Sequence, residues 1–198
     1  MKQMKIIGIT GGTGAGKSAV CAELEKYGAL VVDCDKIARQ VVRKGEPALK
    51  EIVASFGEGI LTSEGELDRR KMGSIVFSDS EKLRCLNEIT HKHIFEQMRK
   101  MLGEATEEFA VLDVPLLFQC DFPIECDFTV AVTAPDDVRI KRITLRDGID
   151  KDAAVARMSK QLSDEEYRMR ADVCFENTGD EKRIKKFAKE LFERVKEN

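Results

Sequence analysis

Five short runs of mostly apolar residues are spaced along this chain, and stretches with helical periodicity separate them. The runs cover residues 5–10, 29–32, 109–113, 127–133 and 172–175. Short apolar runs bounded by glycine or polar residues are typical of buried strands. Strands that alternate with helices pair in parallel, with right-handed connections. The pattern therefore predicts an α/β fold built on a doubly wound, five-stranded parallel sheet.

Helical spacing is clearest after the first run and at the end of the chain. Val20, Cys21 and Leu24 recur at helical spacing before Gly28, and residues 181–196 form an amphipathic pattern. The remaining predictions are helix over 36–56 with a break near Gly45, loop or hairpin over 57–68, a long helix over 81–102 and charged helices over 136–171. Met158, Leu162 and Met169 are expected to pack within this charged segment.

The distance between the second and third predicted strands points to a subdomain. About 75 residues separate them, far more than one crossover helix needs. No linker divides the chain, so we expect a single domain of residues 1–198 with three parts. The parts are a core of about 1–35, 105–135 and 172–198, a subdomain of about 36–104, and a further helical segment of about 136–171.

Composition narrows the class of protein. Net charge is −3, so the whole chain has no general attraction to nucleic acid or to a membrane surface. No apolar run approaches the roughly 20 residues of a membrane span. Residues 1–5 lead directly into the first strand and do not resemble a signal peptide. We therefore expect a cytoplasmic protein without nucleic-acid or membrane partners; its oligomeric state stays open, with a monomer plausible.

Six cysteines are scattered along the chain without a CxxC pair. A disulfide framework is typical of small secreted scaffolds and does not suit this size and composition. We expect free and mostly buried thiols.

A phosphate-binding loop follows the first strand. Residues 11–18 match GxxxxGK[ST] in full, and they read Gly11, Gly12, Thr13, Gly14, Ala15, Gly16, Lys17 and Ser18. Glycines let successive N–H groups point at phosphate oxygens, and the helix that follows presents its N-terminal dipole to the same anion. Lys17 would reach the β- and γ-phosphates, and the Ser18 hydroxyl would bind Mg²⁺. The motif therefore predicts ATP and Mg²⁺ as ligands.

The rest of the chain favours a small-molecule kinase among P-loop proteins. A GTPase would carry DxxG and NKxD elements, and neither occurs here. Machines driven by ATP usually need a longer core. A kinase fits both the length and the inserted subdomain, and a non-enzymatic nucleotide-binding module is a distant alternative.

Two carboxylates follow the second strand. Asp33 ends it and Asp35 comes two residues later. Ligands of doubly wound sheets bind outside the carboxyl ends of the strands, so Asp33 can share a crevice with the P-loop and act on an attacking hydroxyl. Either aspartate could instead cap the next helix, and Asp35, which adjoins it, is the better candidate for the N-cap.

The charged segment 136–171 has two interpretations. The simpler is a pair of solvated helices joined by ion pairs. The sharper is a lid whose arginines close over the triphosphate. Arg142 and Arg146 lie one helical turn apart and can point the same way.

Several signatures together resemble the dephospho-coenzyme A kinase family. They are GITGGTGAGKS, VVDCDKIARQVV, EGELDRRKMGSIVF, LNEITHKHI, VLDVPLLF and FENTGD, in order from about residue 6 to 180. The resemblance implies transfer of the ATP γ-phosphoryl group to the ribose 3′-hydroxyl of dephospho-CoA, the last step of coenzyme A synthesis. It also implies an adenylate-kinase-like core, with 36–104 as an acceptor-binding subdomain and 136–171 as a mobile lid. Another small-molecule or nucleoside kinase of this fold is the alternative.

The resemblance also assigns individual residues. Asp33 matches the base, Lys17 the phosphate contact, and Ser18 with Asp113 the Mg²⁺ ligands. It places the turn at Asn177 near adenine and Arg69 within the acceptor subdomain. We also expect Asp35, His91, Pro115 and Leu116 to contact the acceptor, with a polar surface or structural role as the alternative for His91. This chain departs from the family pattern at Lys92, where proline is usual, and at Gln119, where glutamate is usual.

Overall fold

The computed structural model describes residues 4–197, so Met1–Gln3, part of the stretch that we expect not to be a signal peptide, lie outside the described residues. The chain forms two compact units. Unit 1 is Met1–Asp33 with Ala105–Asn198, and unit 2 is Cys34–Glu104.

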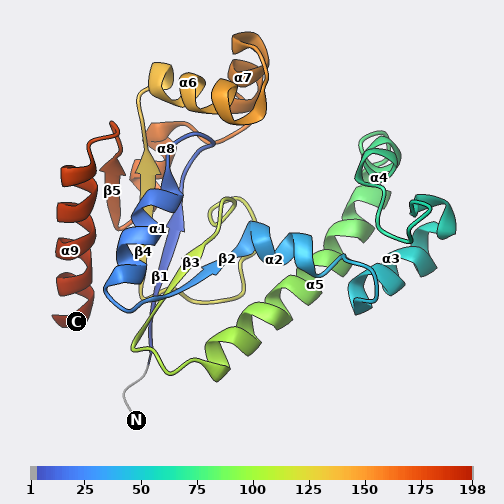
Figure 1. The fold of residues 1–198 in the computed structure, drawn as a ribbon, viewed down its shortest axis with the longest axis horizontal. Coiled ribbons are helices and arrows are strands. Elements are labelled where there is room, and N and C mark those ends of the chain that lie inside the picture. Colours follow the sequence, from blue (N-terminus) through green and yellow to red (C-terminus); the bar gives the residue numbers. More distant parts are fainter. Residues whose placement is uncertain (1–3, 198) are drawn as a thin grey trace. The chain divides into compact units, whose positions relative to one another are not determined.

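A five-stranded parallel sheet is the centre of unit 1, as predicted. Its strands are β1 (Lys5–Thr10), β2 (Leu30–Asp33), β3 (Phe109–Asp113), β4 (Phe128–Thr133) and β5 (Val173–Glu176). They are ordered β2-β3-β1-β4-β5, with every pair parallel (Figure 1). The chain therefore winds to one side of β1 first and to the other side afterwards. Such a switch point places a ligand site outside the carboxyl end of β1.

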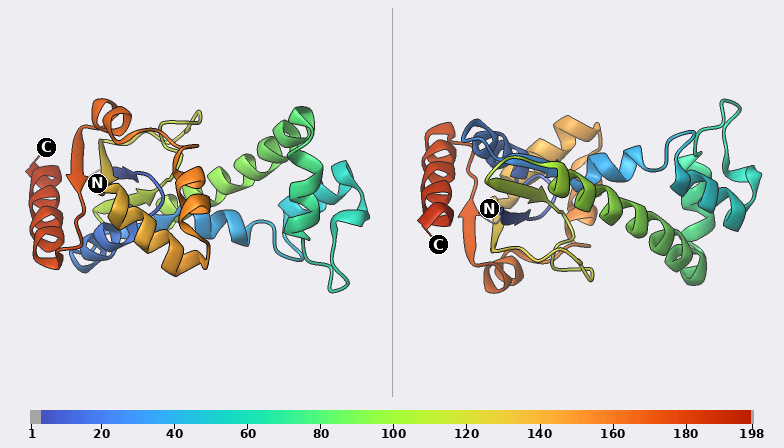
Figure 2. Two further views of the ribbon diagram at one scale, coloured as in Figure 1. Left: turned by 90° about the horizontal axis from the view of Figure 1, so that it is seen from above. Right: turned by 90° about the horizontal axis from the view of Figure 1, so that it is seen from below.

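Alternate residues of the strands form the main hydrophobic core. Ile7 and Ile9 of β1 and Val130 and Val132 of β4 point to one face of the sheet, as the period of two requires. That face is covered by α1 (Lys17–Lys26) and α9 (Glu181–Glu197). Both views in Figure 2 show α9 alongside β5. The core thus holds α1, and with it the end of the P-loop, against the sheet.

Three helices follow β4 within unit 1: α6 (Asp136–Asp147), α7 (Lys151–Met158) and α8 (Asp164–Arg170). They bury Ile143, Ala154 and Tyr167 completely. The expectation that Met169 packs is wrong, because its side chain is 73% exposed. Two residues turn a helix by a little over half a revolution, so a helix that buries Tyr167 directs Met169 to solvent.

Unit 2 is helical. It consists of α2 (Cys34–Gln40), α3 (Pro47–Phe56), a 3₁₀ turn η1 (Glu58–Ile60), α4 (Arg69–Val76) and α5 (Ser80–Glu104). Residues 57–68 contain one antiparallel bridge, Leu61 to Leu67, which agrees with the predicted hairpin. Ile52, Ile60 and Met98 are fully buried in this unit. The helix α4, which the periodicity did not mark, begins after Asp68, whose carboxylate caps it by accepting from Lys71 N–H.

The cysteines are free thiols, as expected, but most of them are not buried. Cys21 is buried, and Cys34, Cys85, Cys120, Cys126 and Cys174 are partly exposed. No helix within residues 4–197 is long and apolar enough to cross a membrane.

Candidate active site

Glycine determines the shape of the loop between β1 and α1. Gly11, Gly14 and Gly16 have φ angles of 143°, 76° and 87°, in the region that favours glycine. A β-carbon on Gly16 would lie 2.3 Å from the side-chain nitrogen of Asn177. The sequence motif and the backbone therefore agree, because these positions exclude side chains on both conformational and steric grounds.

The loop leads directly into the start of α1. Gly16 precedes this helix and no side chain caps it, so the first N–H groups of α1 are not used by a side-chain cap. Such groups form an anion site together with the helix dipole. Lys17 folds back over the loop and its Nζ donates to Gly11 O at 3.0 Å, while Ser18 lies exposed in the first turn of α1.

Arg142 and Asn177 hold the carbonyl side of the loop. Arg142 Nη1 donates to Gly14 O at 3.0 Å and to Ala15 O at 3.1 Å. Asn177, which is 2% exposed, donates from Nδ2 to Ala15 O at 3.0 Å and to Gly16 O at 3.3 Å. Desolvation lowers the pKa of the Arg142 guanidinium. These two side chains support the loop in this structure.

Arg146 also reaches the loop but is mainly paired with a carboxylate. Its Nη2 lies 3.4 Å from Thr13 Oγ1, and its Nε donates to Asp147 Oδ1 at 2.7 Å. The guanidinium of Arg146, and after it that of Arg157, hold the pKa of Asp147 at about 2. Arg142 and Arg146 therefore both contact the P-loop from α6, as their spacing suggested.

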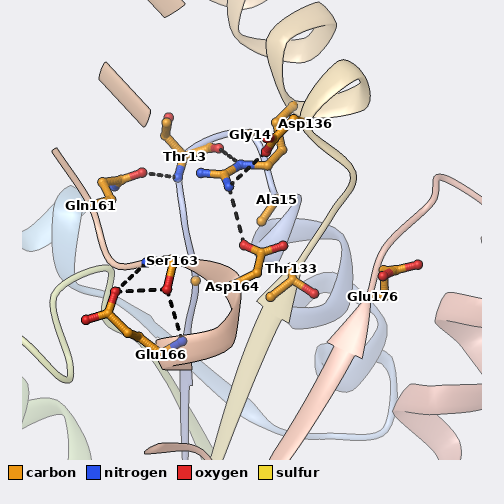
Figure 3. Close-up of polar contacts among 12 residues, drawn as sticks. Thr13, Gly14, Ala15, Thr133, Asp136, Gln161, Ser163, Asp164, Glu166 and Glu176 are labelled. Atoms are coloured by element: carbon orange, nitrogen blue, oxygen red, sulfur yellow. Dashed lines mark hydrogen bonds and ion pairs between the residues drawn. The ribbon is translucent and has the colours of Figure 1, made fainter. Parts of the chain in front are cut away.

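Arg139 is a further loop contact that the sequence did not single out. Its side chain is buried, Nε donates to Thr13 O at 3.0 Å, and Nη1 lies 3.4 Å from Asp164 Oδ1. Burial raises the pKa of the Asp164 carboxyl. Gln161 Oε1 accepts from Thr13 N–H at 2.7 Å. Figure 3 shows Gln161 and Asp164 on either side of this part of the loop.

Two carboxylates end neighbouring strands beside the loop. Asp33 of β2 is paired in register with Asp113 of β3, so both residues stand at the carboxyl edge of the sheet. Asp33 is exposed, whereas Asp113 is half-buried with its Oδ1 atom buried. Burial raises the pKa of the Cys21 thiol, and the charges of Asp113 and Asp33 act in the same direction while Lys17 opposes them. Asp33, Asp113 and Lys17 thus all lie within electrostatic range of Cys21 in α1.

The segment after β3 joins this edge at Pro115, whose carbonyl accepts from Thr10 Oγ1 at 3.1 Å. Leu116 follows and is half-exposed.

Asp35 belongs to unit 2, and its expected capping role is wrong. The helix α2 begins at Cys34, so Asp35 lies inside its first turn and not before it.

Arg69 and His91 also belong to unit 2. Arg69 is the exposed first residue of α4. His91 lies on α5 with its ring 5.6 Å from that of Phe95.

Lys92 donates from Nζ to Glu51 Oε1 at 3.0 Å, and His93 Nε2 is 3.0 Å from the same oxygen. Within residues 4–197 no three His, Cys, Asp or Glu side chains gather as a metal cluster.

Comparison with known proteins gives consistent results. The family model described as dephospho-CoA kinase matches residues 5–183. The chain is 40% identical over 190 residues to a dephospho-CoA kinase of Thermobifida fusca, covering 96% of this chain and 95% of that one. A dephospho-CoA kinase of Carboxydothermus hydrogenoformans is 40% identical over 182 residues, covering 90% and 88%.

Solved structures agree on the fold. A Thermus thermophilus protein superposes with a TM-score of 0.83 at 32% identity, covering 98% of both chains. Shikimate kinase from Acinetobacter baumannii has a TM-score of 0.56 at 16% identity, covering 100% of this chain and 96% of that one, and shares the fold alone.

Proposed function

This chain belongs to the dephospho-CoA kinase family, and from that premise we propose how its residues phosphorylate dephospho-CoA with ATP. The observation that carries the mechanism is the meeting of three features at one edge of the sheet. They are the uncapped start of α1, the P-loop amides before it, and the register pair of Asp33 and Asp113. The first two bind phosphate, and the third supplies carboxylate oxygen where an acceptor or a cation is needed.

The triphosphate of ATP binds in the loop of residues 11–18. Lys17 leaves Gly11 O and donates to the β- and γ-phosphates, where its charge offsets the charge that develops on transfer. The carbonyl side of the loop is already held by Arg142 and Asn177, so the amide side is preorganised for the anion. Arg146, exchanging Asp147 for phosphate, adds a second cation from α6.

Asp33 orients the acceptor and takes its proton. The ribose 3′-hydroxyl oxygen of dephospho-CoA forms a bond to the γ-phosphorus, the bond from that phosphorus to the β–γ bridging oxygen breaks, and ADP leaves. The hydroxyl proton passes to the Asp33 carboxylate. Because the transition state of phosphoryl transfer is loose, Asp33 contributes more by orienting the hydroxyl than by removing its proton early. Its exposure at the end of β2 leaves it accessible to an acceptor.

Mg²⁺ suits the residues beside the loop. Ser18 offers a hydroxyl in the first turn of α1, and Asp113 offers a half-buried carboxylate. Oxygen donors of this kind, completed by phosphate and water, are the ligands that Mg²⁺ prefers. When bound, the ion neutralises charge on the transferring phosphates. We assign Ser18 and Asp113 to this ion.

Acceptor binding is assigned to residues 36–104, and a lid to residues 136–171. Arg69 is exposed at the start of α4, where a guanidinium can pair with a phosphate of dephospho-CoA. Asp35, His91, Pro115 and Leu116 complete the assigned acceptor residues. Asn177 uses its side chain on the P-loop, so any contact with adenine falls to the backbone of the turn that follows β5.

A direct assay tests the proposal. Pure protein is incubated with ATP, Mg²⁺ and either dephospho-CoA or a panel of nucleosides, and the products are identified by mass. We expect one added phosphoryl group on dephospho-CoA, at the 3′ position of its ribose. Phosphorylation of a nucleoside with none of dephospho-CoA would instead support another kinase of this fold.

A further inference from the structure

Thr13 is the residue at which segment 136–171 holds the P-loop. All three of its polar groups are engaged by side chains from that segment. Its N–H donates to Gln161 Oε1 at 2.7 Å, its carbonyl accepts from Arg139 Nε at 3.0 Å, and its hydroxyl lies 3.4 Å from Arg146 Nη2. The backbone of one loop residue is therefore fixed from both sides.

Gln161 differs in kind from the other side chains on the loop. Lys17, Arg139, Arg142 and Asn177 all donate to loop carbonyls. Gln161 instead accepts from a loop N–H, that of Thr13. Since a P-loop directs N–H groups toward the phosphates, an acceptor on Thr13 N–H lies on the phosphate side of the loop.

The turn that carries Gln161 is well supported. Its own N–H donates to Met158 O at 3.0 Å, which closes the end of α7. Two residues later Ser163 and Glu166 form a capping box that begins α8. Asp164 then pairs with Arg139, the residue that holds Thr13 O. The backbone on both sides of Gln161 is thus fixed, and this holds the half-buried carboxamide beside Thr13.

A carboxamide has two functional ends. Oε1 is occupied by Thr13, and Nε2, on the same carbon, carries two donor hydrogens and no charge. We propose that Gln161 is a nucleotide-positioning residue, fixing Thr13 through Oε1 and donating from Nε2 to a phosphate oxygen of ATP. This rests on the proposed use of the P-loop as the ATP site. Glutamate would accept the same Thr13 hydrogen bond, but it would place a negative charge beside the triphosphate.

Gln161→Glu and Gln161→Ala separate the two ends of the side chain. The glutamate variant keeps the acceptor and replaces the donor with a charge, whereas alanine removes both. We expect Gln161→Ala to raise the Kd and the KM for ATP by about tenfold or more, the effect of one hydrogen bond to a charged group. Gln161→Glu should raise both further. Gln97→Glu, the same substitution on α5, should leave both unchanged.

Three measurements keep the result interpretable. ATP binding is followed by calorimetry, steady-state kinetics give kcat and KM, and the amide resonance of Thr13 reports whether its hydrogen bond survives. In Gln161→Glu that resonance should stay at a shift typical of a hydrogen-bonded amide, unlike in Gln161→Ala, while ATP affinity falls, which a purely structural residue would not produce. If Gln161→Glu binds ATP as wild type does while Gln161→Ala is weakened, Oε1 acts alone and the proposal is wrong.

Two further results, ATP binding by Gln161→Met and the activity of the wild-type protein, also test the proposal. Gln161→Met, of similar size without either polar group, should match the alanine variant; wild-type affinity in Gln161→Met would overturn the proposal. If the wild-type protein binds ATP but phosphorylates no dephospho-CoA, the proposed function fails, and the calorimetric series still tests Gln161.

Discussion

At the scale of single residues, Lys17 is expected to act in catalysis with little part in stabilising the fold. Its ammonium donates to Gly11 O within the loop itself, so its loss removes little of the folded structure. Lys17→Ala should lower kcat by about 10²–10³, as expected for removing one preorganised charge from a developing transition state. Steady-state kinetics on the purified variant measure this loss, and urea unfolding should show nearly unchanged stability.

Lys26 provides a matched control on the same helix. It is exposed and paired with Glu23 three residues earlier at 2.6 Å. Lys26→Ala should keep wild-type kcat. Near-normal turnover in Lys17→Ala would remove Lys17 from the mechanism.

The effects of replacing Asp33 and Asp35 by asparagine are expected to differ. Asp33→Asn keeps the size of the side chain but removes its charge and basicity. It should lower kcat by about 10²–10⁴ while ATP affinity changes little. Asp35→Asn should act on acceptor use or stability, because Asp35 lies in the first turn of α2, where a carboxylate interacts well with the helix dipole.

Kinetics with dephospho-CoA as the varied substrate distinguish the two carboxylates. A dead Asp35→Asn beside a fully active Asp33→Asn would mean that the base had been assigned to the wrong residue. Full activity in both would remove a carboxylate base from the mechanism.

The site contacts that the sequence predicts join residues close together along the chain, whereas those it does not predict join residues far apart along the chain. The P-loop was predictable because its chemistry is contained in eight consecutive residues. Arg139 and Gln161 reach Thr13 from 126 and 148 residues away, and Asn177 reaches Ala15 from 162 away. No local pattern marks these contacts, because they exist only after the sheet has brought α6, α8 and β5 to the loop.

At the scale of elements, glycine geometry gives a matched comparison. Gly16 and Gly28 both have φ of 87°, one before α1 and one after it. A β-carbon on Gly28 meets nothing within 4 Å, whereas one on Gly16 meets Asn177 at 2.3 Å. Gly28→Ala should cost only the conformational strain of about 1–2 kcal/mol. Gly16→Ala should cost more and weaken ATP binding.

Urea unfolding and calorimetric ATP titration of both variants test this comparison. Equal stability and equal ATP affinity in the two variants would show that the Asn177 contact does not constrain the loop.

The junction of α6 and α7 should have a defined pH dependence. Arg146 and Arg157 lower the pKa of Asp147 to about 2 from an ordinary value of 3.8. A carboxyl whose pKa is lower in the folded state stabilises it above the unfolded value, and this stabilisation is lost as pH falls through the folded value. Asp147→Asn should therefore have a lower Tm than wild type at pH 7.

The Tm difference between wild type and Asp147→Asn should shrink below pH 4 and vanish only below about pH 2. Scanning calorimetry across that range measures it. A difference that stays constant with pH would mean that the Asp147 charge is not responsible.

Elements were predictable where the hydrophobic period was unambiguous. The predicted strands agree with the observed ones to within one residue at each end. The helix α4 was missed because it has only eight residues, among them glycine and serine, and its cap at Asp68 follows a hairpin. Met169 was misjudged because an apolar residue on a seven-residue helix says little about which side is buried.

At the scale of the molecule, the two compact units suggest a division of labour between substrates. ATP binding is assigned to unit 1, and most of the acceptor residues to unit 2. Arg69→Ala should raise the KM for dephospho-CoA by about tenfold or more, since a charge-assisted hydrogen bond contributes about 1.5–3 kcal/mol. The KM for ATP should stay close to wild type.

Arg70→Ala is the control, because this arginine is the exposed neighbour of Arg69 on α4. Kinetics with each substrate varied in turn give the comparison. A larger effect in Arg70→Ala would move the acceptor contact by one residue, and equal changes in both KM values would mean that Arg69 does not act on the acceptor alone.

The strand order also bears on how the chain acquires its structure during synthesis. The strands β1 and β2 are made first, yet they are not neighbours, because β3 lies between them. The strands β1 and β2 therefore have no strand partner until residues 109–113 exist. Residues 34–104 are contiguous and need no such partner. In a nascent chain stopped after residue 104, we expect residues 34–104 to resist protease and the segment from β1 to β2 to be cleaved. That segment should become protected once β3 has been synthesised.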